Sequence, residues 1–274
     1  MERLAKDSVK ASLRETQEIR WAQPIKPGLR FASEPKRFLP FFFTDLATTI
    51  LVMITVTANL SLIQAVLSEQ ILPTEMFYSL AAGMILLGVL IVVNLWITGA
   101  VIHQSRKPEE FTESWRLSFN KLPTLILALI VVSLITLLFL VIPYIGIFLA
   151  AIILLFVNQY IMVDNKGFWE SIVSSAKTFR NRIPSVFFAW LFSVVVALVI
   201  VGAFSIPMAV HSLYSGVNLS PQDFTVDAQL YQASPALYSI ALIIMVLGTS
   251  ISKTYGLKYL TEIYLQFKRK KWLS

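Results

Sequence analysis

The chain has 274 residues, of which 56% are hydrophobic and only 14% are charged, and its mean hydropathy is +0.70. Soluble domains carry about 25% charged residues, and a soluble fold of this length would leave far too much apolar surface in water. The chain has no cysteine, which excludes disulfides, thiolate metal sites and cysteine nucleophiles. The composition therefore predicts a protein whose solvent is mostly lipid.

The N-terminal segment is polar up to about residue 38 and mixes acidic with basic side chains. A cleavable signal peptide needs an apolar core near the N-terminus, and this segment has none. We expect the first spanning helix to direct insertion itself. The predicted organisation is a cytoplasmic N-terminal segment (1–37), a transmembrane domain (38–267) and a basic cytoplasmic tail (268–274).

Six stretches of the sequence are long and apolar enough to cross a bilayer, which takes about 20 residues in a helix. Pro143 and Gly146, in "VIPYIG", divide the third stretch from the fourth, because proline ends a helix and glycine loosens the turn. The predicted spans are Leu39–Leu67, Glu75–His103, Leu122–Ile142, Tyr144–Val163, Pro184–Ala209 and Pro235–Leu257.

The basic residues decide the predicted orientation. Nine lysines and arginines precede Phe38, four lie between spans two and three, four lie between spans four and five, and six follow from Lys253 onward. The loops after spans one, three and five contain none of the 23. Cytoplasmic loops carry the excess of lysine and arginine, so both termini are predicted to be cytoplasmic. The net charge of +7 is thus a topology signal, and no basic patch interleaved with aromatics indicates nucleic-acid binding.

The phrase Phe-x-Glu-Ser occurs twice on the predicted cytoplasmic side, beginning at Phe111 and at Phe168. Each copy continues through an amphipathic stretch to a proline, Pro123 or Pro184, which we expect to turn the chain into the next span. A weaker third copy, "GLRFASEPKRFLPFFF", precedes span one. The sequence therefore predicts an all-α, polytopic membrane protein of three repeated transmembrane hairpins, each entered through a cytoplasmic interfacial helix.

The two interfacial stretches carry the residues expected to meet lipid or a partner protein. Helical spacing places Phe168 and Ile172 on an apolar face, and it places most of the polar residues, Ser171 and Ser174 among them, on the other. Such stretches can simply anchor helix ends at the interface, or they can form a collar that binds anionic lipid or other membrane proteins. The candidate contact residues are Phe111, Trp115, Phe119, Phe168, Trp169, Lys177, Arg180 and Arg182.

Few side chains could carry a reaction. His103 and His211 lie at opposite membrane faces in the predicted topology, so they cannot share a metal ion, and we expect each to be an interfacial polar residue. No HExxH motif, phosphate-binding glycine loop or nucleophile elbow occurs in the sequence. We therefore expect no catalytic residues, no cofactor and no bound metal.

Polar residues inside the spans suggest an alternative function. Asp45 lies five residues after Pro40, about 7–8 Å along a helix, which places it near the cytoplasmic headgroups and within reach of Arg37. An acid within a span can instead be an ion or proton site, and amides can bond between helices or line a solute path. The candidate intramembrane polar residues are Asp45, Asn59, Asn94, Asn158 and Gln159.

One part of the chain resembles a known family. A proline-broken hairpin is followed by an aliphatic helix, the turn Asp164-Asn165-Lys166-Gly167 and a serine-rich helix that starts near Ser171, and the chain ends with the aromatic-basic "YLTEIYLQFKR". In these features it resembles the YciC-like family of uncharacterised bacterial inner-membrane proteins, best over Val141–Leu198 and poorly over the first 100 residues. The membrane domain fused to some glycerophosphodiester phosphodiesterases is distantly similar, but nothing in this sequence supplies that catalytic domain.

The resemblance implies a multi-pass location in the bacterial inner membrane but assigns no activity, because the family is uncharacterised. The repeated interfacial phrase and the lack of a recognisable catalytic motif lead us to expect a non-enzymatic protein that organises the membrane or envelope, or maintains its lipids, through contacts with anionic lipid or with other membrane proteins. A channel or transporter for a neutral or small solute is the alternative.

Overall fold

The computed structural model describes residues 21–58, 74–141, 146–216 and 226–271, and these ranges contain helices and no strand. The predicted all-α class is confirmed, as is the presence of six helices long and apolar enough to cross a membrane. In these ranges the apolar helices run Pro35–Thr55, Leu80–Arg106, Phe111–Phe139, Gly146–Asp164, Ile183–Ser215 and Pro235–Arg269.

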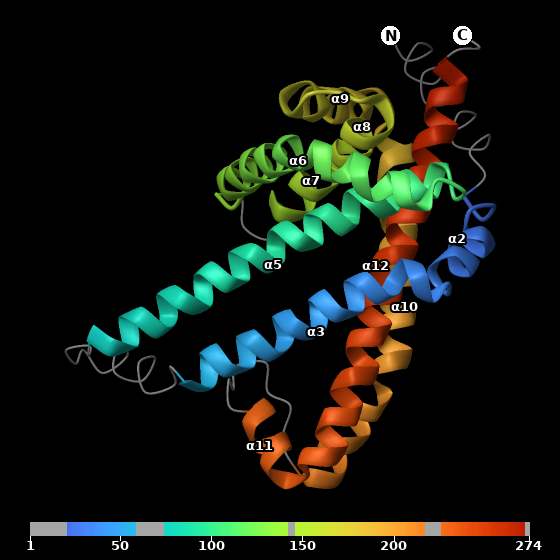
Figure 1. Ribbon diagram of the computed structural model, residues 1–274. Coiled ribbons are helices and arrows are strands. Elements are labelled where there is room, and N and C mark those ends of the chain that lie inside the picture. Colours follow the sequence, from blue (N-terminus) through green and yellow to red (C-terminus); the bar gives the residue numbers. More distant parts are fainter. Residues whose placement is uncertain (1–20, 59–73, 142–145, 217–225, 272–274) are drawn as a thin grey trace. The chain divides into compact units, whose positions relative to one another are not determined.

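Each predicted span corresponds to helix in the described residues, but the helix of span three begins at Phe111 rather than Leu122, and the helix of span six continues to Lys271 rather than ending at Leu257. The predicted end of span one, Leu67, lies outside the described residues, and so does Pro143. Span four is not one helix but two, α7 and α8. The helices in Figure 1 are α2 (Ile25–Ala32), α3 (Pro35–Ala58), α5 (Thr74–Arg106), α6 (Phe111–Phe139), α7 (Gly146–Ile153), α8 (Val157–Asp164), α9 (Phe168–Asn181), α10 (Ile183–Ser215), α11 (Val226–Ala233) and α12 (Pro235–Lys271).

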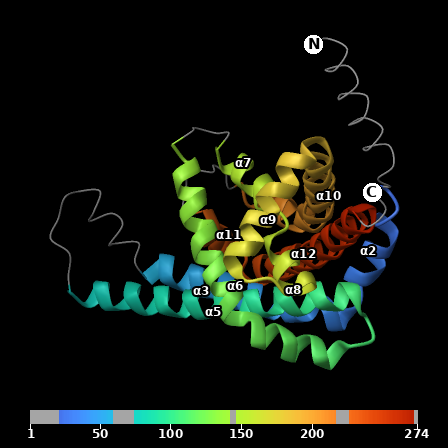
Figure 2. The same cartoon turned by 90° about the horizontal axis from the view of Figure 1, so that it is seen from above.

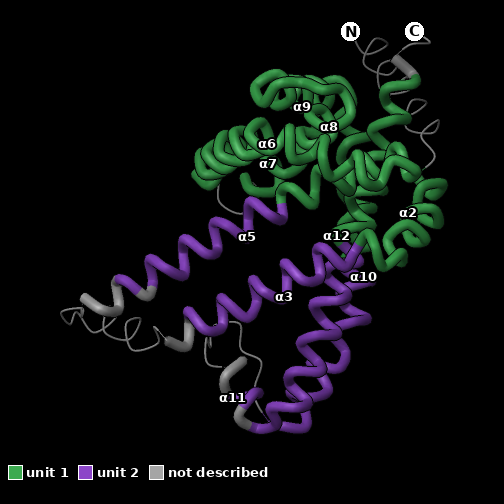
Figure 3. The backbone as a smooth tube through the Cα atoms, viewed as in Figure 1, with its two compact units in different colours: residues 1–37, 95–197, 253–274 green, residues 38–94, 198–252 purple. Residues whose placement is uncertain are grey.

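The chain divides into two compact units, coloured separately in Figure 3. Unit 1 comprises Met1–Arg37, Leu95–Ala197 and Lys253–Ser274, and unit 2 comprises Phe38–Asn94 and Leu198–Ser252. The boundaries fall within helices α3, α5, α10 and α12. The sequence of unit 2 contains no lysine or arginine, so all 23 belong to unit 1.

The prolines behave differently in the two copies of the repeated phrase. Pro123 lies inside α6, so the amphipathic stretch and the third span are one continuous helix, and the predicted turn there is wrong. Transmembrane helices tolerate such prolines because neighbouring groups and local adjustments satisfy the freed carbonyl. In the second copy α9 ends at Asn181, Arg182 leaves the helical conformation, and Pro184 is the second residue of α10. Proline is well suited to that first turn, where its missing N–H has no helical partner to lose.

In unit 1, helices α6, α7, α8 and α9 pack against one another, and Figures 1 and 2 show α9 beside α8. The C-terminal part of α12 adds a buried aromatic stripe that includes Tyr255, Tyr259 and Phe267. The rings of Tyr264 and Phe267 meet that of Phe156, the last residue of the break between α7 and α8. Packing in this unit is therefore centred on the broken fourth span.

Unit 2 has its own apolar core, formed where α11 and α12 meet α3 and α10. His211 is buried in α10, and its Nε2 lies 3.0 Å from the carbonyl oxygen of Leu230 in α11. This contact joins α10 to α11, and the prediction that His211 is an interfacial polar residue stays a prediction. The core residues are Leu230, Tyr238, Leu242 and Val246, with Phe42, Leu46, Met53, Met208 and Met245 packed against them.

Candidate functional site

The second Phe-x-Glu-Ser phrase opens α9, and its serines face the protein interior. Ser171 and Ser175, one turn apart, are buried. Ser171 Oγ donates a hydrogen bond to the carbonyl of Gly167 at 2.8 Å. Ser175 Oγ donates to the carbonyl of Ile153 at 2.8 Å and accepts the backbone N–H of Phe156 at 3.2 Å. One hydroxyl therefore satisfies two backbone groups at the break between α7 and α8, where the helical hydrogen bonds are interrupted.

The first phrase, at the start of α6, makes matching bonds. Ser114 and Ser118 are also buried, and Ser114 Oγ donates to the carbonyl of Glu110 at 2.6 Å. Ser118 Oγ donates to the carbonyl of Trp96 in α5 at 2.6 Å. This pair is separated by 22 residues, and so is the corresponding pair in α9. In both copies the second serine thus joins the amphipathic helix to the membrane helix before it, and we call this bond the serine clamp.

The faces of α9 differ from those predicted. Ser171, expected opposite the apolar face, is buried beside Ile172, while Trp169 is 60% exposed. Lys177 and Arg180 are exposed on the same helix. The helix therefore presents a tryptophan and basic residues outward and uses its small hydroxyl residues for packing.

The aromatic residues predicted to contact lipid fall into two groups. The ring of Trp115 meets those of Trp96 and Phe111 edge to face, with centroids 5.3 and 6.3 Å apart, and Trp96 Nε1 donates to the Trp115 carbonyl at 3.0 Å. Phe119 and Trp169 are each 60% exposed. Trp115 is therefore held within the protein, whereas Phe119 and Trp169 offer an outward aromatic surface.

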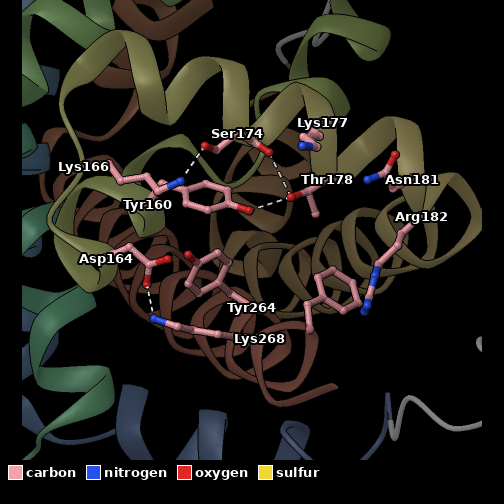
Figure 4. A pocket seen from close by; sticks show the side chains of 11 residues that line it. Tyr160, Asp164, Lys166, Ser174, Lys177, Thr178, Asn181, Arg182, Tyr264 and Lys268 are labelled. Carbon is pink, nitrogen blue, oxygen red and sulfur yellow. Dashed lines mark hydrogen bonds and ion pairs between the residues drawn. The ribbon is translucent and has the colours of Figure 1, made fainter. Parts of the chain in front are cut away.

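A pocket of about 740 Å³ lies in unit 1, bordered by α8, α9 and the end of α12 (Figure 4). Asn165 ends α8 with a left-handed backbone (φ 57°), a conformation that asparagine tolerates, and the chain then returns along the pocket as α9. Four basic side chains, from Lys166, Lys177, Arg182 and Lys268, and the single carboxylate of Asp164 line the pocket. This excess of positive charge favours an anionic occupant.

The basic side chains of the pocket are held in place by bonds and aromatic rings. Lys268 Nζ lies 2.6 Å from Asp164 Oδ1. Lys166 Nζ donates to Ser174 Oγ at 2.8 Å and lies 4.9 Å from the centre of the Tyr160 ring. The guanidinium of Arg182 lies 5.4 Å from the centre of the Phe267 ring. The sequence predicted Lys177 and Arg182 as contact residues but did not predict Tyr264 and Lys268, because α12 approaches α8 only in the folded chain. Lys166 and Tyr160 were not predicted either, because they lie outside the amphipathic stretch.

Asp45 belongs to a polar cluster in unit 2. The residue is 9% exposed; its Oδ1 accepts a hydrogen bond from Asn94 Nδ2 at 3.2 Å, and its Oδ2 accepts one from Ser250 Oγ at 3.1 Å. Helices α3, α5 and α12 each supply one member. Arg37, the partner suggested from the sequence, donates instead to Glu34 at 2.8 Å and to Gln104 Oε1 at 3.3 Å in unit 1. Ser250 gave no sequence signal, because serines are common in these helices.

The other predicted intramembrane polar residues do not join this cluster. Asn158 and Gln159 belong to α8 in unit 1, where Gln159 is buried. Asn59 lies outside the described residues. The structure therefore brings together Asp45 and Asn94 and does not show a path lined by all the predicted amides.

His103 is buried at the end of α5. Its Nδ1 lies 2.9 Å from Ser114 Oγ, whose own proton goes to the carbonyl of Glu110, so Nδ1 is the donor. Lys107 Nζ donates to the Glu110 carboxylate at 2.6 Å, and this hydrogen bond lowers the pKa of Glu110. Among the described residues, no group of three or more histidine, aspartate or glutamate side chains could hold a metal ion.

The six apolar helices define a multi-pass membrane protein, and the pocket in unit 1 is its candidate binding site. No protein-family model matches the chain, and neither a curated protein nor a solved structure matches it.

Proposed function

We propose that the protein is a non-enzymatic component of the bacterial inner membrane that organises the cytoplasmic leaflet by binding anionic lipid. The observation that carries this proposal is the pair of opposite faces on α9. The serine clamp holds one face against the fourth span, while Trp169, Lys177 and Arg180 are exposed on the other. Aromatic and basic side chains on an amphipathic helix suit the headgroup layer.

The distribution of charge supports a cytoplasmic place for α9. All lysines and arginines lie in unit 1, which contains α9, and the cytoplasmic leaflet carries the anionic lipids that attract them. Each basic residue near such a surface contributes about 1 kcal/mol. Lys177 and Arg180 together favour an anionic surface by about 2 kcal/mol, or about 30-fold. The inner-membrane location rests on the YciC-like resemblance.

The exposed aromatic residues provide the test. We expect the protein to co-purify with lipid that is richer in anionic species than the membrane extract. Trp169→Ser and Phe119→Ser should lower the amount of that lipid, because each removes an exposed ring from the amphipathic segment. Tyr214→Ser is the matched control, since Tyr214 is 88% exposed but lies in unit 2. Equal losses in all three variants, or no anionic enrichment in the unmodified protein, would contradict the proposal.

A channel or transporter for a neutral or small solute is the second candidate. The cluster of Asp45, Asn94 and Ser250 favours it, because an acid in a span that bonds to two other helices is by default a functional candidate. Proteoliposomes should then be permeable to small neutral solutes. Liposomes that contain the protein and stay as tight as empty ones would exclude this candidate.

A further inference from the structure

We propose that the pocket bordered by α8, α9 and α12 is a discrete site for one phosphate group, carried by an anionic lipid or by a soluble phosphate ester. The inference deepens the proposed function and rests on it, because it names the chemistry that the lipid-binding unit recognises. It differs from attraction along the surface of α9 in requiring a single occupant inside the pocket.

The charges in the pocket match a phosphate. Lys268 pairs with the carboxylate of Asp164 at 2.6 Å, and Lys166 Nζ lies 3.5 Å from the carboxylate of Glu170, which does not line the pocket. In the part of the chain that the structure describes, Lys177 has no ion-pair partner and is exposed. Lysine and arginine are the residues that bind phosphate by charge-assisted hydrogen bonds. The pocket thus keeps positive charge beyond what its own acid requires.

A neutral donor and the size of the pocket also suit a phosphate ester. Thr178 donates its hydroxyl proton to the carbonyl of Ser174 at 2.9 Å and accepts that of Tyr160 at 2.6 Å, so the neutral donor left at this wall is the amide of Asn181 (Figure 4). The volume of about 740 Å³ falls within the range of ligand pockets, about 300–1,000 Å³. It exceeds what a bare phosphate fills, so the group that the phosphate esterifies has room.

The first copy of the phrase provides an internal comparison. The alignment that superposes the two serine pairs places Glu109 at the position of Lys166 and Asn120 at that of Lys177. Both copies form the serine clamp, yet the α6 copy has no positive charge at either position. The clamp therefore does not require these lysines, and a ligand of the second copy accounts for them.

Substitutions at two neighbouring residues of α9 can distinguish binding inside the pocket from attraction to the surface of the helix. Asn181 lines the pocket and is exposed, so Asn181→Trp obstructs the space without changing the charge. Arg180 is exposed outside the pocket lining, so Arg180→Gln removes a charge without filling the space. Lys177→Gln removes a pocket charge from an exposed position, and it tests the site again if the tryptophan disturbs folding.

The measurement is retention of lipid by the full chain in nanodiscs of phosphatidylcholine, with or without phosphatidylglycerol, followed by native mass spectrometry. We expect one phosphatidylglycerol held per chain, an affinity about tenfold lower in N181W and K177Q, and a change below about fivefold in R180Q. The proposed phosphate site would be overturned if N181W and K177Q retained phosphatidylglycerol as well as the unmodified protein does. A larger loss of affinity in R180Q than in either of these variants would also overturn it.

Inorganic phosphate is the second probe, and it distinguishes the two sources of the group. Displacement of phosphatidylglycerol by phosphate, blocked by N181W, supports the site with a lipid occupant. Phosphate binding in phosphatidylcholine alone, without any preference for phosphatidylglycerol, supports the site with a soluble ester and contradicts the lipid function. If anionic lipid is enriched and neither N181W nor K177Q changes this enrichment, the proposed phosphate site is wrong. The proposed lipid-binding function would still be supported.

Discussion

Removing the hydroxyl of Ser175 tests the serine clamp most directly. In Ser175→Ala, the carbonyl of Ile153 and the N–H of Phe156 both lose their hydrogen bond to the Ser175 hydroxyl at the break between α7 and α8. An unsatisfied buried polar group costs about 1–3 kcal/mol, so the two groups together should lower the free energy of unfolding by about 2–6 kcal/mol. Ser175→Thr keeps the hydroxyl and should recover much of this loss.

The first copy supplies a matched control. Ser118→Ala removes a hydrogen bond to the carbonyl of Trp96, but that residue lies inside α5 and its carbonyl keeps its helical partner. Hydrogen bonds between helices in membranes average about 0.6 kcal/mol, which is the loss expected here. The two variants thus delete the same atom at equivalent positions and should differ several-fold in cost.

Equilibrium unfolding in mixed detergent micelles measures both costs, and hydrogen exchange at the Phe156 amide reports the broken bond locally. We expect faster exchange in S175A and unchanged exchange in S118A. Equal losses of stability, with the Phe156 amide still protected, would refute the reasoning. That result would mean that α7 and α8 join into one helix once the hydroxyl is gone.

Two further predictions concern packing and pH. Gly99→Ala should lower the free energy of unfolding by about 1–3 kcal/mol, because the added methyl group would overlap the Ser118 hydroxyl. Gly88→Ala has no neighbour within 4 Å and should raise the thermal midpoint slightly. Equal thermal midpoints in the two variants would contradict this prediction. Burial raises the pKa of Glu34, but the hydrogen bond from Arg37 and nearby positive charges outweigh it and lower the pKa below 4.5. The charged form therefore stabilises the fold above about pH 4.5 and loses this effect as the pH falls further, so Glu34→Gln should lower the thermal midpoint at pH 7 and match the unmodified protein in acid. A difference that does not change with pH would contradict it.

Much of the fold could be predicted from the chain because its strongest signals are local. Long apolar runs predict the six helices, and Pro184 marks the start of α10. The break in span four has no such mark, since Leu154–Phe156 contains neither glycine nor proline. It depends on a serine that lies about 20 residues further along the chain. Conversely, Pro123 predicts a turn before span three, but α6 continues through it as one helix.

The candidate site was predictable only in the part contributed by one helix. The basic residues of α9 were singled out from their place in an amphipathic stretch, whereas Lys268 and Tyr264 come from α12 and meet α8 through tertiary packing. The Asp45 cluster shows the same limit. Asp45 and Asn94 could be selected as unusual residues in apolar helices, but their meeting with each other and with Ser250 depends on how three helices pack.

The serine clamp and the pocket are physically connected through the broken span. Tyr160 and Asp164 are four residues apart, so they share one face of α8, and that face lines the pocket. The non-helical residues before Val157 reset the rotation of α8 relative to α7, so the break determines which face of α8 turns toward α9 and α12. Ser175 satisfies the backbone groups at that break. In the first copy, Ser118 only joins α6 to α5. In the second copy, the equivalent Ser175 also stabilises the break that determines which face of α8 lines the pocket.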